Sequence, residues 1–172
     1  MRRTAWAVIL VSSIFGAAEA RAAVWAVNAA GCTSPEGIRY TAGAGSTSYR
    51  STQSTGPITL FCPIAAAVPA CPSAYRLRLT FADPDGPGSS VSVTAQLMRQ
   101  AQKDGSAVGA VPGAIVTSNH SPLTVPTNET SVDFSHDFSV FADDYFVRVD
   151  MNRLLAGSLV SSFYGVALEC TE

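Results

Sequence analysis

Two stretches in the middle of the chain alternate between apolar and polar side chains. The apolar positions are Tyr75, Leu77, Leu79 and Phe81 in the first stretch and Val91, Val93, Ala95 and Leu97 in the second. A two-residue period is typical of a β-strand with one face on a core and the other in water. Residues 83–89 between the stretches are mostly Asp, Pro and Gly, which form turns. The pattern therefore predicts that the two stretches pair as an antiparallel hairpin at the centre of the fold.

The same alternation recurs towards the C-terminus, over residues 145–152 and 164–170. In the last stretch the apolar positions are Tyr164, Val166, Leu168 and Cys170. Residues 58–62 form a further strand candidate, and shorter candidates lie at 38–40, 47–50, 114–117 and 132–140. About 8–10 short strands separated by turn residues, without a fixed repeat, are typical of an all-β protein. We therefore predict a single antiparallel β-sandwich.

Residues 95–103 complicate this prediction, because most of them are good helix formers. The alternation that starts at Val91 nevertheless runs into this segment. We therefore expect a strand that continues to about Arg99, followed by a turn at residues 103–105, with a short helix as the alternative.

The first 22 residues have the features of a secretory signal peptide, with a helical apolar segment. Arg2 and Arg3 precede an apolar run over residues 5–18, and two A-x-A cleavage sites end at Ala20 and Ala22. Cleavage leaves residues 23–172 as the β-sandwich domain; an uncleaved anchor is the alternative. Nothing later approaches the roughly 18 consecutive apolar residues of a membrane span. We therefore expect no membrane span after signal removal, and a secreted or periplasmic location.

The charge of the exported part excludes some partners. Removing residues 1–22 takes away three arginines and one glutamate, which changes the formal net charge from −2 to −4. Lys103 is then the only lysine, and no basic cluster is present in the sequence. This balance argues against nucleic acid and anionic membranes as partners, whereas a protein or glycan partner remains compatible with it.

All four cysteines, Cys32, Cys62, Cys71 and Cys170, lie in the exported part. An even number in an oxidising compartment predicts two disulfides, whereas zinc-site spacings such as C-x-x-C are absent from the sequence. We favour Cys32–Cys62 with Cys71–Cys170, because Cys71 begins one strand and Cys170 ends another. The pairing Cys62–Cys71 with Cys32–Cys170 stays open.

The sequence offers little for nucleophilic catalysis. It contains no G-x-S-x-G motif, and its only histidines are His120 and His136. Ser135, His136 and Asp137 are consecutive, but neighbouring side chains of a strand point to opposite faces. A triad that assembles from distant segments is the remaining enzymatic hypothesis.

Calcium is the candidate metal. Asp83 and Asp85 lie two residues apart in a glycine-containing loop, and Asp143 with Asp144 precedes another strand. Loops of this kind often supply the oxygen ligands that calcium requires. The same residues also form ordinary turns, and the EF-hand spacing is absent from the sequence.

Exposed aromatic rings that stack on sugars are the signature of a glycan-binding surface. The exported part has one tryptophan, Trp25, in its N-terminal arm. Five other rings are candidates for outward positions: Tyr40, Tyr49, Phe61, Phe146 and Phe163. The alternative is that these rings pack against a second sheet.

Several short segments resemble a loose group of small secreted bacterial proteins, mostly hypothetical. They are Gly-Pro-Ile-Thr-Leu-Phe-Cys-Pro-Ile at 56–64 after the early Cys32, Tyr-Phe-Val-Arg-Val-Asp at 145–150, and Tyr-Gly-Val-Ala-Leu-Glu-Cys at 164–170. The resemblance implies a β-sandwich fold and export, and it brings no catalytic residue.

The sequence as a whole favours a non-enzymatic, exported binding or structural protein without a cofactor other than the candidate calcium ion. The first alternative is a calcium-assisted carbohydrate-binding module, and the second is a hydrolase with a dispersed triad.

Overall fold

The computed structural model describes residues 23–35, 40–43, 45–64, 68–103, 108–122, 127–139, 141–157 and 159–171. Within these residues the chain forms ten strands and two 3₁₀ turns, η1 (Ala29–Gly31) and η2 (Ser118–His120). The strands are β1 (Ala23–Asn28), β2 (Tyr40–Gly43), β3 (Ser46–Tyr49), β4 (Ile58–Pro63), β5 (Ala74–Ala82), β6 (Val91–Ala101), β7 (Val108–Thr117), β8 (Asn128–Phe134), β9 (Asp143–Arg153) and β10 (Ser162–Thr171).

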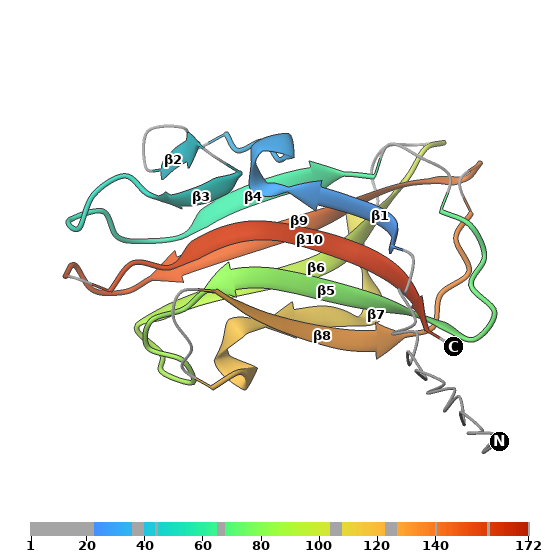
Figure 1. Ribbon diagram of the computed structural model, residues 1–172. Coiled ribbons are helices and arrows are strands. Elements are labelled where there is room, and N and C mark those ends of the chain that lie inside the picture. Colours follow the sequence, from blue (N-terminus) through green and yellow to red (C-terminus); the bar gives the residue numbers. More distant parts are fainter. Residues whose placement is uncertain are drawn as a thin grey trace, which may run out of the picture.

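The strands form two antiparallel sheets that lie face to face (Figure 1). The six-stranded sheet has the order β2-β3-β10-β5-β8, and β1 also pairs with β10. The four-stranded sheet has the order β4-β9-β6-β7. The predicted antiparallel β-sandwich is therefore confirmed. The predicted signal peptide, residues 1–22, lies outside the described residues, as do Ile38, Arg39 and Val140. No helix in the described part of the chain is long and apolar enough to cross a membrane.

The core lies between the sheets and consists of the inward residues of each strand. On β5 every second side chain from Tyr75 to Phe81 is buried, while Arg76, Arg78 and Thr80 point outward. β6 and β9 show the same alternation. Full burial of one large aliphatic or aromatic side chain contributes about 1.5–3 kcal/mol. The stripes read from the sequence therefore supply the main driving force for this packing.

The predicted hairpin of β5 and β6 is wrong. β5 lies between β10 and β8 in the six-stranded sheet, whereas β6 lies between β9 and β7 in the four-stranded sheet. Residues 83–90 carry the chain from one sheet to the other. Alternation shows that each strand has one buried face. Because both strands bury that face in the same core from opposite sides, the pattern does not reveal which strands share hydrogen bonds.

Residues 95–101 form strand and not helix. β6 pairs with β9 over eleven registered positions, from Val91 to Ala101. On its other side it pairs with β7. Two neighbouring strands satisfy the backbone of β6, and its inward side chains enter the core. These contacts outweigh the small differences in intrinsic helix propensity.

A β-bulge near the start of β10 changes which aromatic ring faces the core. Phe163 is opposite Phe81 and Gly165 is opposite Thr80, so Tyr164 is the additional residue. Phe163 is fully buried, whereas Tyr164 is half-buried. The prediction that Tyr164 belongs to the core stripe and Phe163 faces outward is therefore wrong. A strict two-residue period cannot show a bulge, which inserts one residue into a strand.

Two disulfides close the fold, Cys32–Cys62 and Cys71–Cys170. This is the pairing that the sequence favoured. Cys71 lies just before β5, and Cys170 lies near the end of β10, where Cys170 is opposite Tyr75. The second bridge links residues 99 positions apart. Closing a loop of this length stabilises the fold by about 4–5 kcal/mol, because the bridge lowers the conformational entropy of the unfolded chain.

Arg153, at the end of β9, is a fully buried arginine. Its Nη1 donates to the carbonyl oxygens of Ser51 and Ser54, at 3.0 and 2.9 Å. Its Nη2 donates to the carbonyl oxygens of Thr52 and Gly157. The guanidinium also lies 5.7 Å from the centroid of the Tyr49 ring. One side chain thus fixes the loops that follow β3 and β9.

Replacing Arg153 should therefore destabilise the protein. We expect Arg153→Met to lower the free energy of unfolding by about 2–4 kcal/mol, because four carbonyl oxygens lose their donor. Urea denaturation followed by circular dichroism measures this change. Arg50→Met, at an exposed arginine, is the control and should change stability by less than about 0.5 kcal/mol. Equal effects of the two substitutions would contradict the role assigned to Arg153.

Candidate functional site

The outer face of the six-stranded sheet carries a groove. Across β1, β10 and β5 the residues opposite one another are Ala26, Ala167 and Arg78, and in the next row Asn28, Gly165 and Thr80. Small residues on β1 and β10 leave a hollow of about 300 Å³ beside the longer side chains of β5. A Cβ at Gly165 would lie 2.9 Å from the carbonyl oxygen of Val27, so the close approach of β1 requires glycine there.

A second hollow of about 250 Å³ lies towards β8 and is also lined by Arg78. Its other lining residues come from β5, β8 and β10: Arg76, Glu129, Thr130, Ser131 and Glu169. We refer to the two hollows together as the sheet groove.

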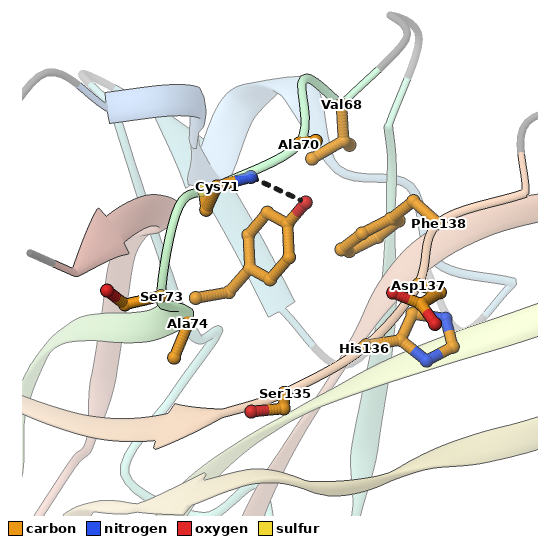
Figure 2. Close-up of a pocket in the computed structure, with 10 residues that line it drawn as sticks. Val68, Ala70, Cys71, Ser73, Ala74, Ser135, His136, Asp137 and Phe138 are labelled. Carbon is orange, nitrogen blue, oxygen red and sulfur yellow. Dashed lines mark hydrogen bonds between the residues drawn. The ribbon is translucent and has the colours of Figure 1, made fainter.

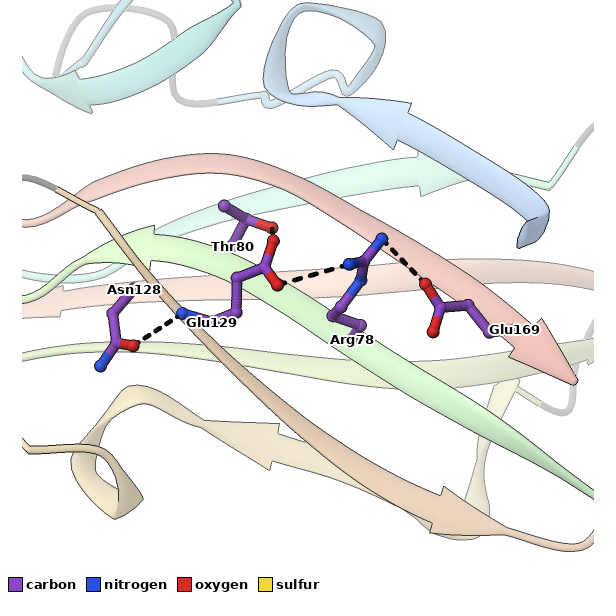
Figure 3. A network of polar contacts seen from close by, with 5 residues as sticks. All are labelled: Arg78, Thr80, Asn128, Glu129 and Glu169. Carbon is purple, nitrogen blue, oxygen red and sulfur yellow. Dashed lines mark hydrogen bonds and ion pairs between the residues drawn. The ribbon is translucent and has the colours of Figure 1, made fainter. Parts of the chain in front are cut away.

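Charged side chains form a connected network in the sheet groove (Figure 3). Arg78 lies between two carboxylates, with Nη1 3.3 Å from Glu129 and Nη2 2.8 Å from Glu169. Thr80 donates its hydroxyl to Glu129 at 3.3 Å. Among the residues that the structure describes, the Nε of Arg78 is buried and has no hydrogen-bond partner. The network therefore holds its members in place, and the side chains of Arg78 and Glu129, which are 38% and 53% exposed, remain accessible to a ligand.

Arg76 and Asp133 form a separate pair at the end of the groove. Their two hydrogen bonds measure 2.6 and 2.8 Å, and the side-chain hydrogen bond to Asp133 raises the pKa of Arg76. Such a bidentate pair restricts both side chains to one geometry.

Tyr164 supplies an aromatic ring at the other end of the sheet groove. It is the additional residue of the β10 bulge, and it lines the hollow together with Asn28 and Arg78. Bulges commonly redirect a side chain next to a binding site. The groove thus combines one half-buried aromatic ring with a guanidinium donor and carboxylate acceptors. This combination suits an uncharged ligand that has many hydroxyl groups.

The outer face of the four-stranded sheet carries a different aromatic pair. Phe61 and Phe146 meet edge to face with their ring centroids 5.8 Å apart, and Phe61 is 37% exposed. Beside them Arg148 donates to Asp150 at 2.7 Å, and Thr59 donates to the same carboxylate at 2.8 Å. The outward prediction is correct for these two rings.

The remaining outward candidates differ from the prediction. Tyr49 is buried in the core, and its single hydroxyl hydrogen is shared between the carbonyl oxygens of Gly56 and Met151, at 2.6 and 3.1 Å. Phe163 is buried by the phase change at the bulge. The side chain of Tyr40 lies outside the described residues. Trp25 belongs to β1 and packs against the core, so the N-terminal arm is a paired strand.

Asp83 and Asp85 organise the loop between β5 and β6. Oδ2 of Asp85 accepts hydrogen bonds from the backbone N–H groups of Ser90 and Val91, at 2.9 and 3.3 Å. Asp83 is 3% exposed and accepts from the hydroxyl of Ser118 and from the backbone N–H of Asp85. Oδ1 of Asp85 is buried and makes no hydrogen bond. In the described part of the chain no three His, Cys, Asp or Glu side chains come together as a metal site would need.

Burial raises the pKa of Asp83 to about 6, against the opposing effect of the Ser118 hydrogen bond. The fold therefore favours the protonated acid. Between the ordinary aspartate pKa and about 6, the folded state binds more protons than the unfolded state, so the free energy of unfolding falls as pH rises.

This coupling predicts a pH-dependent effect of Asp83→Asn. The variant should match the wild type near pH 4, where the acid is neutral, and should become relatively more stable towards pH 7. Melting temperatures measured from pH 4 to 8 in the presence of a chelator test this. The matched control is Asp137→Asn, at an exposed carboxylate. A difference between Asp83→Asn and wild type that stays constant with pH would count against the buried, protonated Asp83.

Ser135, His136 and Asp137 do not lie in a strand, because β8 ends at Phe134. All three line one hollow at the end of the sandwich (Figure 2), and the exposed Ser135 and Asp137 alternate with the half-buried His136. Nε2 of His136 lies 3.2 Å from the hydroxyl of Tyr145, not beside a serine. His120 is exposed at the end of η2. The described geometry thus gives neither histidine the partners of a catalytic triad.

The β-sandwich is similar to that of solved carbohydrate-binding modules. The chain is similar to the CBM22-2 xylan-binding domain from Paenibacillus barcinonensis Xyn10C, with 9% identity and a TM-score of 0.53 over 87% of this chain and 100% of that domain. It is also similar to the CBM22-1–CBM22-2 tandem domain of the same protein, with 11% identity and a TM-score of 0.57 over 92% of this chain and 52% of the tandem. At this identity the likeness shows the fold.

No protein-family model matches the chain, and no curated protein matches it. The fold that the resemblance to small secreted bacterial proteins implied is the fold observed.

Proposed function

We propose that the protein is a non-enzymatic glycan-binding module that holds a neutral polysaccharide in the sheet groove. The observation that carries this proposal is the pairing of Tyr164 with the network of Arg78, Glu129 and Glu169 along one sheet face. The likeness to a xylan-binding domain supports a glycan ligand and makes xylan the first polysaccharide to test.

Binding would use two kinds of contact. The ring of Tyr164 would pack on the apolar face of a sugar unit, which removes apolar surface from water. Hydroxyl groups would accept from Arg78 and donate to Glu129 and Glu169, forming charge-assisted hydrogen bonds. Because these side chains already hold one another in place, little conformational entropy is lost when a ligand binds.

Truncation of the aromatic ring should therefore weaken binding. We expect Tyr164→Ala to raise the dissociation constant for xylan or another bound β-glycan by about tenfold or more, as removal of an aromatic anchor usually does. Affinity electrophoresis in gels that contain xylan, mixed-linkage β-glucan or soluble cellulose derivatives measures the change. Phe141→Ala is the control, because Phe141 is 95% exposed and lies outside the groove.

Two further variants decide which face binds. Glu129→Gln should weaken binding as well, because it removes a charged acceptor from the groove. Phe61→Ala should leave binding unchanged. If Phe61→Ala weakens binding and Tyr164→Ala does not, the ligand lies on the four-stranded sheet and the groove assignment is wrong. Retention by none of the polysaccharides would overturn glycan binding itself.

The proposed module works outside the cytoplasm. The signal peptide expected at residues 1–22 supports secretion or export to the periplasm, and so do two disulfides in a chain of this size. A polysaccharide ligand is compatible with that location.

We also propose that Asp83 and Asp85 bind a calcium ion in the loop between β5 and β6. The buried Oδ1 of Asp85, which makes no hydrogen bond, would be one ligand and Asp83 another. Two carboxylates cannot complete the six to eight oxygens around the ion, so backbone carbonyls and water would supply the rest. The ion would hold the loop before β6.

A calcium ion bound only to the folded protein should raise its melting temperature. At about 100 times the dissociation constant the stabilisation is about 2.7 kcal/mol, which corresponds to several degrees. Thermal unfolding in calcium chloride and in EDTA measures the shift, and the Asp83→Asn/Asp85→Asn double variant should lose it. Identical melting temperatures in both solutions would remove calcium from the proposal without affecting the groove.

A further inference from the structure

The hollow lined by Ser135, His136 and Asp137 is a second concave site of the molecule. We refer to it as the end pocket. It has a volume of about 230 Å³ and lies between residues 68–75, before and at the start of β5, and residues 135–138, after β8. Figure 2 shows Cys71 and Ser73 on one side of it and His136, Asp137 and Phe138 on the other. It shares no lining residue with the sheet groove.

The first wall of the end pocket is fastened by Tyr75. The Tyr75 hydroxyl donates to the carbonyl oxygen of Pro69 at 2.9 Å and accepts from the N–H of Cys71 at 3.2 Å. The Cys71–Cys170 disulfide ties the same segment to β10. This wall is therefore held in place without a ligand.

The second wall is fastened by Tyr145. The hydroxyl of Tyr145 accepts from the N–H of Ser139 at 3.1 Å and contacts Nε2 of His136 at 3.2 Å. The ring of Phe138 packs against both tyrosines, with centroids 4.8 Å from Tyr75 and 4.7 Å from Tyr145. A pocket braced on both sides is pre-organised, which lowers the entropy lost on binding.

The size and lining of the end pocket define the ligand class. Its volume is below the roughly 300–1,000 Å³ of pockets that take drug-sized molecules, so it suits a single ring. Among the lining residues that the structure describes, none is Lys or Arg, so no cation is present to hold an anion. The hydroxyls of Ser73 and Ser135 both donate and accept hydrogen bonds.

His136 and Asp137 extend this polar lining. Burial, with a smaller effect of Arg99, lowers the pKa of His136, so its ring is neutral at pH 7 and has one donor and one acceptor nitrogen. Asp137 adds a carboxylate at an exposed position, where water screens its charge. The aromatic faces are largely occupied, since Tyr75 is 5% exposed and stacks on Phe134. An open aromatic cage, as organic cations require, is therefore not formed by these rings.

We propose that the end pocket binds one neutral sugar ring, such as a terminal unit of a glycan, independently of the sheet groove. The serine hydroxyls, the imidazole and the Asp137 carboxylate match the alternating donors and acceptors of a sugar, and Phe138 supplies an apolar wall. A single ring in a shallow pocket binds weakly, with a dissociation constant in the millimolar range.

Titration of the ¹⁵N-labelled protein with methyl β-D-xyloside and methyl β-D-glucoside, up to about 100 mM, tests the proposal in the millimolar range. We expect saturating shifts of the backbone amide signals of Ser73 and residues 135–138. Choline chloride and sodium acetate, titrated in the same way, should leave these signals unchanged. Absence of shifts with every neutral glycoside, or saturating shifts with choline instead, would overturn the proposal.

Two serines, one in β8 and one just after it, provide a matched pair of variants. Ser135 lines the end pocket and Ser131 lines the sheet groove, and both are exposed, so a larger side chain fits at either position. Ser135→Phe should weaken glycoside binding at least tenfold and leave polysaccharide retention unchanged. Ser131→Phe should weaken polysaccharide retention and leave glycoside binding unchanged. If Ser131→Phe removes the glycoside shifts, the small ligand occupies the sheet groove and the end-pocket assignment is wrong. Loss of polysaccharide binding without loss of the glycoside shifts tests the sheet groove and leaves the end pocket unaffected.

Discussion

The structure depends on the contact between the apolar inner faces of two sheets. Leu77 and Leu79 of β5, from one sheet, and Val93 and Leu97 of β6, from the other, are fully buried in the same core. Since this contact uses every inward position of the central strands, the outward positions are free of packing requirements. The sheet groove is built from those outward positions. The fold thus separates the residues that stabilise it from those available for a ligand.

The sequence predicts the strands better than their arrangement. Alternation depends on local geometry, so β5, β6, β9 and β10 are visible in it. Pairing depends on contacts between distant residues, which explains why β5 and β6 were expected to be neighbours and instead face each other across the core. The Cys71–Cys170 bridge was accessible to sequence reasoning because it follows from the order of strand ends, and β5 and β10 do pair.

The candidate sites were less predictable for the same reason. The outward orientation of Arg78 follows from alternation, but its position between Glu129 of β8 and Glu169 of β10 requires the strand order. Tyr164 was assigned to the core because a bulge is invisible to a strict two-residue period. A signal was present in the adjacent Gly165, since an isolated glycine inside a strand often marks a bulge or a close backbone approach. The end pocket forms where β8 stops, and sequence reasoning extended that strand too far.

The energetics of the two arginine networks support a functional reading of the groove. Arg153 is fully buried and holds four carbonyl oxygens, so its hydrogen bonds contribute to stability. The side chain of Arg78 is 38% exposed and that of Glu129 is 53% exposed, and ion pairs of this kind contribute about 0–1 kcal/mol. The buried Glu169, whose side chain is 8% exposed, needs Arg78 as its partner, whereas stability gives little reason for Glu129 on the other side of Arg78. A ligand that exchanges hydrogen bonds with the exposed Arg78 and Glu129 gives a reason for Glu129, because both side chains are already oriented before the ligand binds.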